Sequence, residues 1–365
     1  MSYTVHRYQP GDEEEIVDCL VEVFDDWPHF NLRCSPVDHW RWKFIDNPPK
    51  LTVATLAKKE REIVGCFHGL PQRLKIGGQT YLSCQGVDAA THPDYRGMGV
   101  YSALRRYKFE LMRETAINFY YVVSAHQLLI DKNKREGRPA LPFTLEQMLR
   151  IHDIDLHLRM DSSEKSLIKR YGYRALREIS RLKGPESNPA KTRDDLKIEE
   201  IKEFDHRIDG FWSNVAAHHK LIIQRDRDYL NWRYCDPRGG EYDVRIAEAD
   251  GRVLGYIVLR VNRYVQDYPT GCIVDLLTLP GQTDVAGELA KYAVEYFDDR
   301  DVNMVQVNVL KNSSHEPIFH GLGFVKHPYK PFMNYAAEYG NGNLDELSKR
   351  DVGVMHFSFG DYDWI

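Results

Sequence analysis

The chain has 365 residues, of which 42% are hydrophobic, 12% aromatic and 28% charged. Since about 100 to 200 residues make a domain, this length predicts two domains, and the composition excludes both a disordered and a membrane-spanning chain. The formal net charge of −5 gives no basic surface for sequence-independent nucleic-acid binding, so small molecules or proteins are the expected partners.

Cysteine usage and the amino terminus indicate a compartment. The 6 cysteines form no Cys-x-x-Cys pair, and the chain opens on the polar sequence MSYTVHRYQPGDEEE, which is not a charged-then-apolar signal. Both features predict a cytoplasmic protein whose thiols are reduced and buried as small apolar groups.

The spacing of apolar residues predicts the same elements in both halves of the chain. The first half predicts a strand at 3–5, helices at 11–24 and around Trp42, strands at 51–57, 62–70 and 81–90, a helix at 100–115 and a strand at 118–124. The second half predicts strands at 242–249, 252–261 and 272–279, a helix at 285–297 and a strand at 304–310. This order predicts an α/β fold with a mixed sheet, antiparallel at first and parallel at its centre.

An internal duplication accounts for this parallel order. The sequence DHWRWKFID at 38–46 recurs as DYLNWRYCD 190 positions later, from Asp38 to Asp228. Two further matches follow in the same order, 60–65 with 250–255 and 87–93 with 274–280. Three ordered matches predict two copies of one fold, at 1–182 and 190–365, joined by the polar, proline-bearing stretch 183–191.

The most informative stretch follows the strand that ends near Thr91 and reads HPDYRGMGVYSAL over residues 92–104. Gly97 and Gly99 let the backbone adopt positive φ and approach a ligand, so that N–H groups and the positive helix end point at phosphate oxygens. The stretch lacks the Lys and Ser/Thr of a Walker loop, and its glycines do not make Gly-x-Gly-x-x-Gly. It predicts an anion-binding helix start, with a simple tight turn as the alternative.

Residues 92–104 resemble the acyl-CoA-binding signature of the GNAT superfamily of N-acyltransferases, Gln/Arg-x-x-Gly-x-Gly/Ala after the fourth strand. Arg96 begins the pattern, and Tyr101 stands where the family has Gly or Ala. The resemblance implies acetyl-CoA as cosubstrate, with its pantetheine arm on the preceding strand and its diphosphate on the N–H groups of the loop. The residues assigned to acetyl-CoA in this way are Ala89, Ala90, Thr91, Arg96, Gly97, Met98, Gly99, Val100, Tyr101 and Ser102.

The second copy resembles the family in its last part, where residues 312–324 read NSSHEPIFHGLGF. Its own loop, PGQTDVAGE at 280–288, has lost the arginine and two glycines and carries Asp284 and Glu288, which would repel a diphosphate. The resemblance implies two tandem GNAT-like acyltransferase folds. The first copy is expected to bind acetyl-CoA, and the second to be a degenerate module that completes the substrate cleft or the fold.

Acetyl transfer to an amine needs a base, an acid and a polarised carbonyl. The segment after the fifth strand of the first copy has no Tyr where the family often has its acid, so His126 is the best-placed group, with a surface histidine as the alternative. Asp88 lies on the cofactor strand, but Asp275 recurs at its place in the second copy, which favours a structural role. The aromatic end at 355–365 predicts a docked terminus, and the Ile365 carboxylate is a candidate base by analogy with tandem family members.

These observations predict a cytoplasmic, acyl-CoA-dependent N-acetyltransferase that acts on the amine of an unidentified acceptor. No nucleic acid or membrane is expected as a partner, and a homo-oligomer is left open. No metal is expected either, since the adjacent His218 and His219 would point about 100° apart on a helix. A non-catalytic acyl-CoA sensor or scaffold is one alternative. The other is a purely structural α/β protein with an incidental glycine turn.

Overall fold

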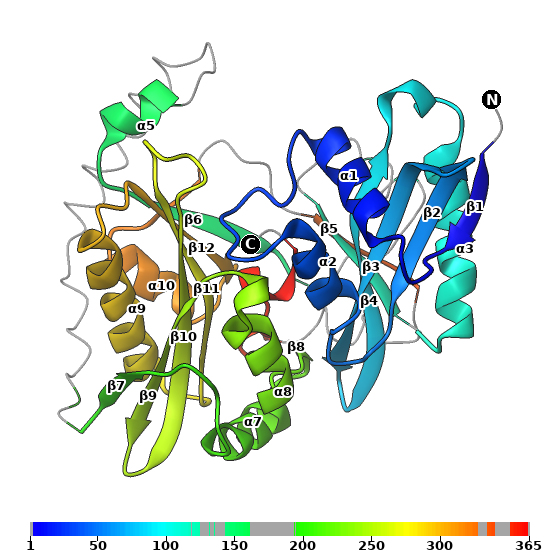
Figure 1. The fold of residues 1–365 in the computed structure, drawn as a ribbon. Helices are drawn as coiled ribbons and strands as arrows, with labels where there is room; N and C mark the ends of the chain where they lie inside the picture. Colours follow the sequence, from blue (N-terminus) through cyan, green and yellow to red (C-terminus); the bar gives the residue numbers. More distant parts are fainter. Residues whose placement is uncertain are drawn as a thin grey trace. The chain divides into compact units, whose positions relative to one another are not determined.

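The computed structural model describes residues 3–117, 119–124, 131, 135, 143–160, 193, 195–327, 334–339 and 351–363. The chain forms two compact units, each built around a mixed sheet (Figure 1). Unit 1 comprises Met1–Pro142, Asp236–Gly240 and Asn334–Ser348, and unit 2 comprises Phe143–Cys235, Glu241–Met333 and Lys349–Ile365.

Unit 1 contains the predicted elements of the first half. In chain order these are β1 (Thr4–Arg7), α1 (Glu13–Phe24), α2 (Pro36–Phe44), β2 (Val53–Lys59), β3 (Glu62–Ile76), β4 (Gln79–Thr91), the 3-10 turn η1 (Pro93–Tyr95), α3 (Val100–Glu114) and β5 (Phe119–Ser124). The sheet order is β1-β2-β3-β4-β5-β14, with β14 at Asn334–Tyr339. The strands β1 to β4 pair antiparallel, while β4 and β5 are parallel, as the sequence predicts.

Unit 2 repeats this arrangement with strands from the second half. Its elements are β6 (Leu145–Ile151), α5 (Ile154–Met160), β7 (Lys197–Glu200), α7 (Arg207–His218), β8 (Leu221–Ile223), α8 (Arg227–Leu230), a π turn η2 (Asn231–Cys235), β9 (Asp243–Ala249), β10 (Arg252–Asn262), β11 (Thr270–Thr278), α9 (Thr283–Asp298), β12 (Met304–Leu310), α10 (His315–Gly321) and β13 (Val325–Lys326). The sheet order is β13-β6-β12-β11-β10-β9-β7, with β11 and β12 parallel. Three 3-10 turns complete the described elements: η3 (Pro237–Gly239), η4 (Val352–Val354) and η5 (Phe359–Asp361).

Two strands do not follow the division of the chain into halves. The strand β6, from the first half, pairs antiparallel with β12 of unit 2, and β14, from the second half, pairs antiparallel with β5 of unit 1. The stretch 183–191, which the sequence suggests as the junction, lies outside the described residues. Strand pairing depends on an open edge and not on sequence neighbourhood, so each unit is completed by a strand from the other half.

Each sheet is covered by helices with one apolar face. In unit 1, α3 packs on β2 and β3 and buries Val100 and Leu104 against Ala57, Val64 and Phe67. In unit 2, α9 packs on β10 and β11 and buries Val285, Leu289 and Phe297 in the larger core of that unit. Within the described part of the chain, every helix is too short or too polar to span a lipid bilayer.

Candidate functional site

The loop between β4 and α3 has the backbone conformation that its sequence predicts. Gly97 and Gly99 have φ of 79° and 81°, in the left-handed region that favours glycine. A Cβ at Gly97 would meet no atom within 4 Å, and one at Gly99 would meet only the Tyr3 hydroxyl at 3.9 Å. The two glycines are therefore required by the turn and leave the backbone accessible, rather than relieving a crowded contact.

The amino terminus of α3 has no side-chain cap and lies at the positive end of the helix dipole. The first intrahelical bond runs from the Ala103 N–H to the Gly99 carbonyl (3.0 Å), so the N–H groups of 100–102 precede the hydrogen-bonded ladder. Gly99 is the N-cap residue and has no side chain to cap them, and the first turn holds no acidic residue. These donors and the helix dipole form an anion-binding helix start on a helix of 15 residues.

Side chains around the loop fix its position on the sheet. Tyr95 and Val100 are buried, and Gly65 on β3 makes room for α3, because a Cβ there would lie 2.9 Å from Val100 Cγ1. Arg96 is exposed, and its Nε donates to the Thr91 carbonyl at 3.4 Å, which holds the guanidinium at the loop. The ring of Tyr101, which replaces the small residue of the family pattern, stacks on Phe67 with 5.6 Å between ring centroids.

The parallel strands β4 and β5 separate close to this loop. The parallel ladder of β4 and β5 ends at Gln85↔Tyr121. Beyond it, Ala90 and Thr91 pair only with β3, through Cys66 and Gly65. Among the described residues of β5, which end at Ser124, none pairs with β4 beyond Gln85, so the two strands separate before the predicted cofactor residues 89–91.

Asp88 sits at an irregularity just before this edge. Cys66 pairs with Ala90 and His68 with Val87, so two residues of β4 oppose Phe67 alone, and Asp88 takes a φ of 43° in this bulge.

Two side chains hold the carboxylate of Asp88, one from α2 and one from the segment between α1 and α2. The Lys43 ammonium lies 2.8 Å from Oδ2, and the Trp27 indole N–H donates to Oδ1 at 3.2 Å. Burial opposes ionisation of this carboxyl, but the charge of Lys43 and the hydrogen bonds from Lys43 and Trp27 contribute to a net lowering of the pKa of Asp88. A carboxylate with a lowered pKa is a weak base, so the geometry favours an anchoring role; the predicted catalytic role stays a prediction. His126 and Ile365 lie outside the described residues.

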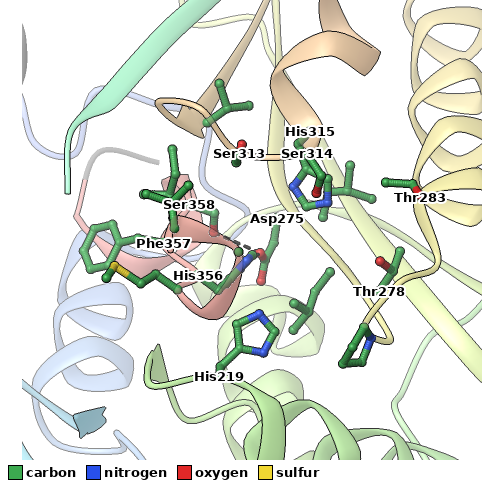
Figure 2. Close-up of a pocket in the computed structure, with 18 of the residues that line it drawn as sticks. His219, Asp275, Thr278, Thr283, Ser313, Ser314, His315, His356, Phe357 and Ser358 are labelled. Atoms are coloured by element: carbon green, nitrogen blue, oxygen red, sulfur yellow. Dashed lines mark hydrogen bonds and ion pairs between the residues drawn. The ribbon is translucent and has the colours of Figure 1, made fainter. Parts of the chain in front are cut away.

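The equivalent Asp275 in unit 2 is enclosed more completely. It is fully buried, and Figure 2 shows it beside His356 and Ser358 from the end of the chain. Burial opposes ionisation, but the Arg225 guanidinium and the His356 ring hold the pKa of Asp275 well below its usual range. Its carboxylate accepts hydrogen bonds from Arg225 Nε (3.0 Å), Tyr234 (3.0 Å), Tyr256 (2.8 Å), His356 Nε2 (2.9 Å) and Ser358 Oγ (2.9 Å).

The network around Asp275 fixes the end of the chain. Residues 355–362 are buried in unit 2, which confirms that this aromatic segment docks. Arg225, itself fully buried, bridges Asp275 to Asp361, whose Oδ1 lies 2.6 Å from its Nη2. The segment is held by two 3-10 turns and an isolated bridge from Met355 to Leu221, and no described residue of it is in a regular strand.

The loop after β11 keeps one feature of the loop after β4 and loses another. Gly281 has φ of 80° and an open surrounding, as Gly97 and Gly99 have. The first turn of α9, however, contains Asp284, and Arg193 lies 3.8 Å from this carboxylate. Negative charge at the helix start disfavours a second anion there.

Sequence reasoning missed a cavity of about 300 Å³ in unit 2, between β11, β12 and the end of the chain. Its lining includes His219, Ser313 and His315. The signal was present, because 274–280 align with the predicted cofactor strand and 312–324 match the family pattern, but the acidic loop led to an interpretation of this copy as non-binding. Among described residues, no group of three His, Cys, Asp or Glu side chains is arranged to hold a metal.

A comparison with protein families identifies the first of these two regions. Residues 4–128 match the family described as acetyltransferase (GNAT) domain. The match runs from β1 through β5 and includes the glycine loop at the start of α3. Among curated proteins, none matches the chain.

Solved structures extend the similarity from this GNAT domain to nearly the whole chain. A probable N-acyltransferase from Enterococcus faecalis V583 has a TM-score of 0.59 at 12% identity, over 92% of this chain and 72% of that chain. A GCN5-related N-acetyltransferase from Anabaena variabilis has 0.60 at 12%, over 93% and 73%. N-myristoyltransferase from Saccharomyces cerevisiae, with bound myristoyl-CoA, has 0.58 at 13%, over 92% and 80%. The prediction of two tandem GNAT-like folds is confirmed, and the chain has an acyltransferase fold.

Proposed function

We propose that the protein is an acyl-CoA-dependent N-acyltransferase that moves an acetyl group from acetyl-CoA to an amine, and that the GNAT domain of unit 1 binds the cosubstrate. The observation that carries this proposal is the uncapped, acid-free start of α3 behind the left-handed Gly97 and Gly99. The corresponding helix α9 of unit 2 begins with Asp284 and lacks this preference for an anion.

In this proposal, two parts of unit 1 hold acetyl-CoA. The backbone N–H groups at the start of α3, with those of Gly97 and Gly99, bind the diphosphate, and Arg96 adds a positive charge at the same loop. Residues 89–91 of β4 hydrogen bond to the amides of the pantetheine arm, since the described ladder with β5 ends at Gln85. The thioester carbon is then presented beyond the end of that ladder, where an amine can approach it.

The transfer itself exchanges one bond for another. The neutral amine attacks the thioester carbon, a C–N bond forms, the C–S bond breaks, a base takes the proton of the amine, and the leaving thiolate is protonated to give CoA. We propose His126 for the proton steps. Asp88 serves better as an anchor, because Lys43 and Trp27 already occupy its two oxygens.

Titration calorimetry of acetyl-CoA into the wild type and into a double variant, Arg96→Ala with Gly99→Glu, tests the proposal. We expect one site per chain in the wild type and none in the variant, because a Glu side chain at the loop opposes the diphosphate by its charge and strains a backbone with positive φ. Gly281→Glu is the matched control, since Gly281 has nearly the same φ and equally open surroundings in unit 2. It should bind like the wild type.

Each contrary result has a distinct meaning. Binding that survives in the double variant but is lost in Gly281→Glu would move the cosubstrate to unit 2, and no binding in the wild type would refute acyl-CoA dependence. Acyl-CoAs of increasing chain length, followed by thiol release in the presence of a panel of amines, then define the acyl group and the acceptor. Binding without thiol release on any amine would favour the sensor or scaffold.

A further inference from the structure

The cavity of unit 2 lies where two parallel strands separate. The ladder of β11 and β12 ends at Ile273↔Val307, yet β11 continues to Thr278 and β12 to Leu310. The other edge of β11 remains paired with β10 as far as Gly255↔Thr278. Residues 275–278 therefore have one edge without a partner strand in the described part of the chain, and they line the cavity together with residues 307–310. Figure 2 shows Asp275 and Thr278 of this strand at the cavity.

An open strand edge of this kind selects for a backbone-like ligand. Alternating N–H and C=O groups along an extended strand pair with the amides of another extended chain, and pockets beside the edge then receive its side groups. The volume of about 300 Å³ is at the lower limit of ligand pockets, so the occupant is small, with about two amide groups.

Two histidine rings at the cavity, His219 and His315, are neutral. The Nδ1–H of His219 donates to the Val215 carbonyl at 2.9 Å, which leaves Nε2 of this ring as an acceptor. Burial lowers the pKa of His219 to about 3 and that of His315 to about 4, so both rings are uncharged at neutral pH. The Ser313 Oγ is buried and has no hydrogen-bond partner within the described part of the chain. A buried hydroxyl without a partner costs free energy that a ligand would recover.

Charge excludes the other ligand classes. Asp275 is the one carboxylate among the lining residues that the structure describes, and Arg225 already neutralises it. An anion would meet the Asp275 carboxylate, while a cation would find no carboxylate among the described lining residues that Arg225 does not already share. The apolar parts of the wall, including Leu276, Phe319 and Met355, favour a ligand that is partly apolar.

We propose that this cavity is a second binding site, which takes a short, neutral, peptide-like ligand extended along the free edge of β11 and hydrogen bonded to Ser313 and His219. The site goes beyond the acyl transfer proposed above. The site uses residues of unit 2 alone, so its test is independent of the acyl-CoA site of unit 1.

The probe for this site is N-acetyl-alanine methylamide, an uncharged peptide with blocked ends and two amide groups. Binding is followed by ligand-observed NMR and calorimetry on the full chain, with pantetheine measured separately and acetyl-CoA present at saturation in a repeat. We expect the blocked peptide to bind with a Kd of roughly 1 mM or tighter, with or without acetyl-CoA. Because the two sites are separate in the chain, loss of acetyl-CoA binding would not affect this result.

Variants of Ser313 give the specific test. Ser313→Ala should weaken binding by about threefold to tenfold, the effect of one hydrogen bond, and should not lower thermal stability, because this buried hydroxyl has no hydrogen-bond partner in the described part of the chain. Ser313→Leu should abolish binding by filling the cavity. Ser213→Ala is the control: it removes a serine hydroxyl on the exposed face of α7, where Oγ donates to the Asp209 carbonyl, and binding should not change.

Three outcomes would overturn the proposal. The blocked peptide fails to bind at roughly 10 mM, it binds equally to the wild type and to Ser313→Leu, or pantetheine alone binds. The last result would mark the cavity as a second acyl-CoA site. Binding of the peptide that weakens in Ser313→Ala and survives in Ser213→Ala supports it.

Discussion

The two units carry the same backbone framework and different polar groups. In both, a glycine on the central antiparallel strand lets a helix approach: a Cβ at Gly65 would lie 2.9 Å from Val100 of α3, and one at Gly255 would lie 3.3 Å from Leu289 of α9. In both, the parallel ladder ends after a few pairs, at Gln85↔Tyr121 and at Ile273↔Val307. In both copies, therefore, the two parallel strands at the centre of the sheet separate after a short ladder.

The chemistry at that opening has diverged. Unit 1 offers uncapped N–H donors and Arg96, which suit an anion, whereas unit 2 offers neutral histidines, a serine hydroxyl and an acidic helix start. The difference teaches that a fold fixes where a ligand can enter, while the charges at the helix start decide which ligand it is. The following predictions are designed to test whether the two units differ in this way.

The largest expected effect is on the paired aspartates. Asp275→Asn should cost about 3–5 kcal/mol of unfolding free energy, because it leaves a fully buried Arg225 without one of its two carboxylates. Asp88→Asn should cost less, since Asp88 is 11% exposed and has two side-chain partners instead of five. Urea unfolding of both variants checks the order. Equal losses would mean that the two carboxylates play the same structural role.

A buried histidine in unit 1 predicts a dependence of stability on pH. His68 is fully buried, accepts from Trp40 Nε1 at 3.2 Å and donates to the Asp88 carbonyl at 3.2 Å, so its neutral form fits the site. Burial lowers its pKa to about 4. The unfolded chain takes up this proton near pH ~6.5. Between the two values the unfolded state binds more protons, so stability falls as pH is lowered through this window.

The full effect for His68 is about 3 kcal/mol, reached near pH ~4. His219 and His315 add the same kind of dependence to unit 2, which has two such rings in place of one. Hydrogen exchange resolved by mass spectrometry, from pH 7 down to 5, should show protection falling in both units and more steeply in unit 2. Protection in unit 2 that does not change with pH would contradict the assignment of neutral rings there.

The repeated glycines predict matched losses of stability. Gly65→Ala and Gly255→Ala should each cost about 1–3 kcal/mol, because the new methyl group would overlap backbone and side-chain atoms on both sides. Gly210→Ala on α7 is the control; it has open space and should be neutral or stabilise by up to about 1 kcal/mol. Thermal unfolding measures all three. A large loss in one unit alone would show that the framework is not equivalent in the two copies.

The smallest effect concerns the single arginine at the proposed diphosphate loop. Arg96→Ala should raise KM for acetyl-CoA about threefold to tenfold at unchanged kcat, because an exposed charge contributes about 1 kcal/mol to binding. The effect should diminish at high salt. Arg193→Ala, at the start of α9, is the counterpart in unit 2 and should change neither constant. An equal rise in KM for both would locate the cosubstrate elsewhere.

Much of the fold could be predicted because local patterns decided it. Trp40 and Trp42 mark a buried helix, the alternation around Gly77 marks a hairpin, and the Gly97 to Gly99 spacing marks a left-handed turn before a helix. The candidate site was predictable only in part. The N–H donors follow from local sequence, whereas the partners of Asp88, Lys43 and Trp27, lie 45 and 61 positions away.

The sequence by itself determined the duplication, the mixed α/β class and the glycine loop, since these depend on residues close together in the chain or on repeated identities. Tertiary structure alone decided that β6 and β14 pair with the sheet of the other half, and that Asp275 gathers Arg225 and His356. These contacts join residues up to 210 positions apart, as for Ser124 and Asn334. No local pattern encodes such pairs, because any open strand edge or buried charge accepts the partner that the whole fold brings to it.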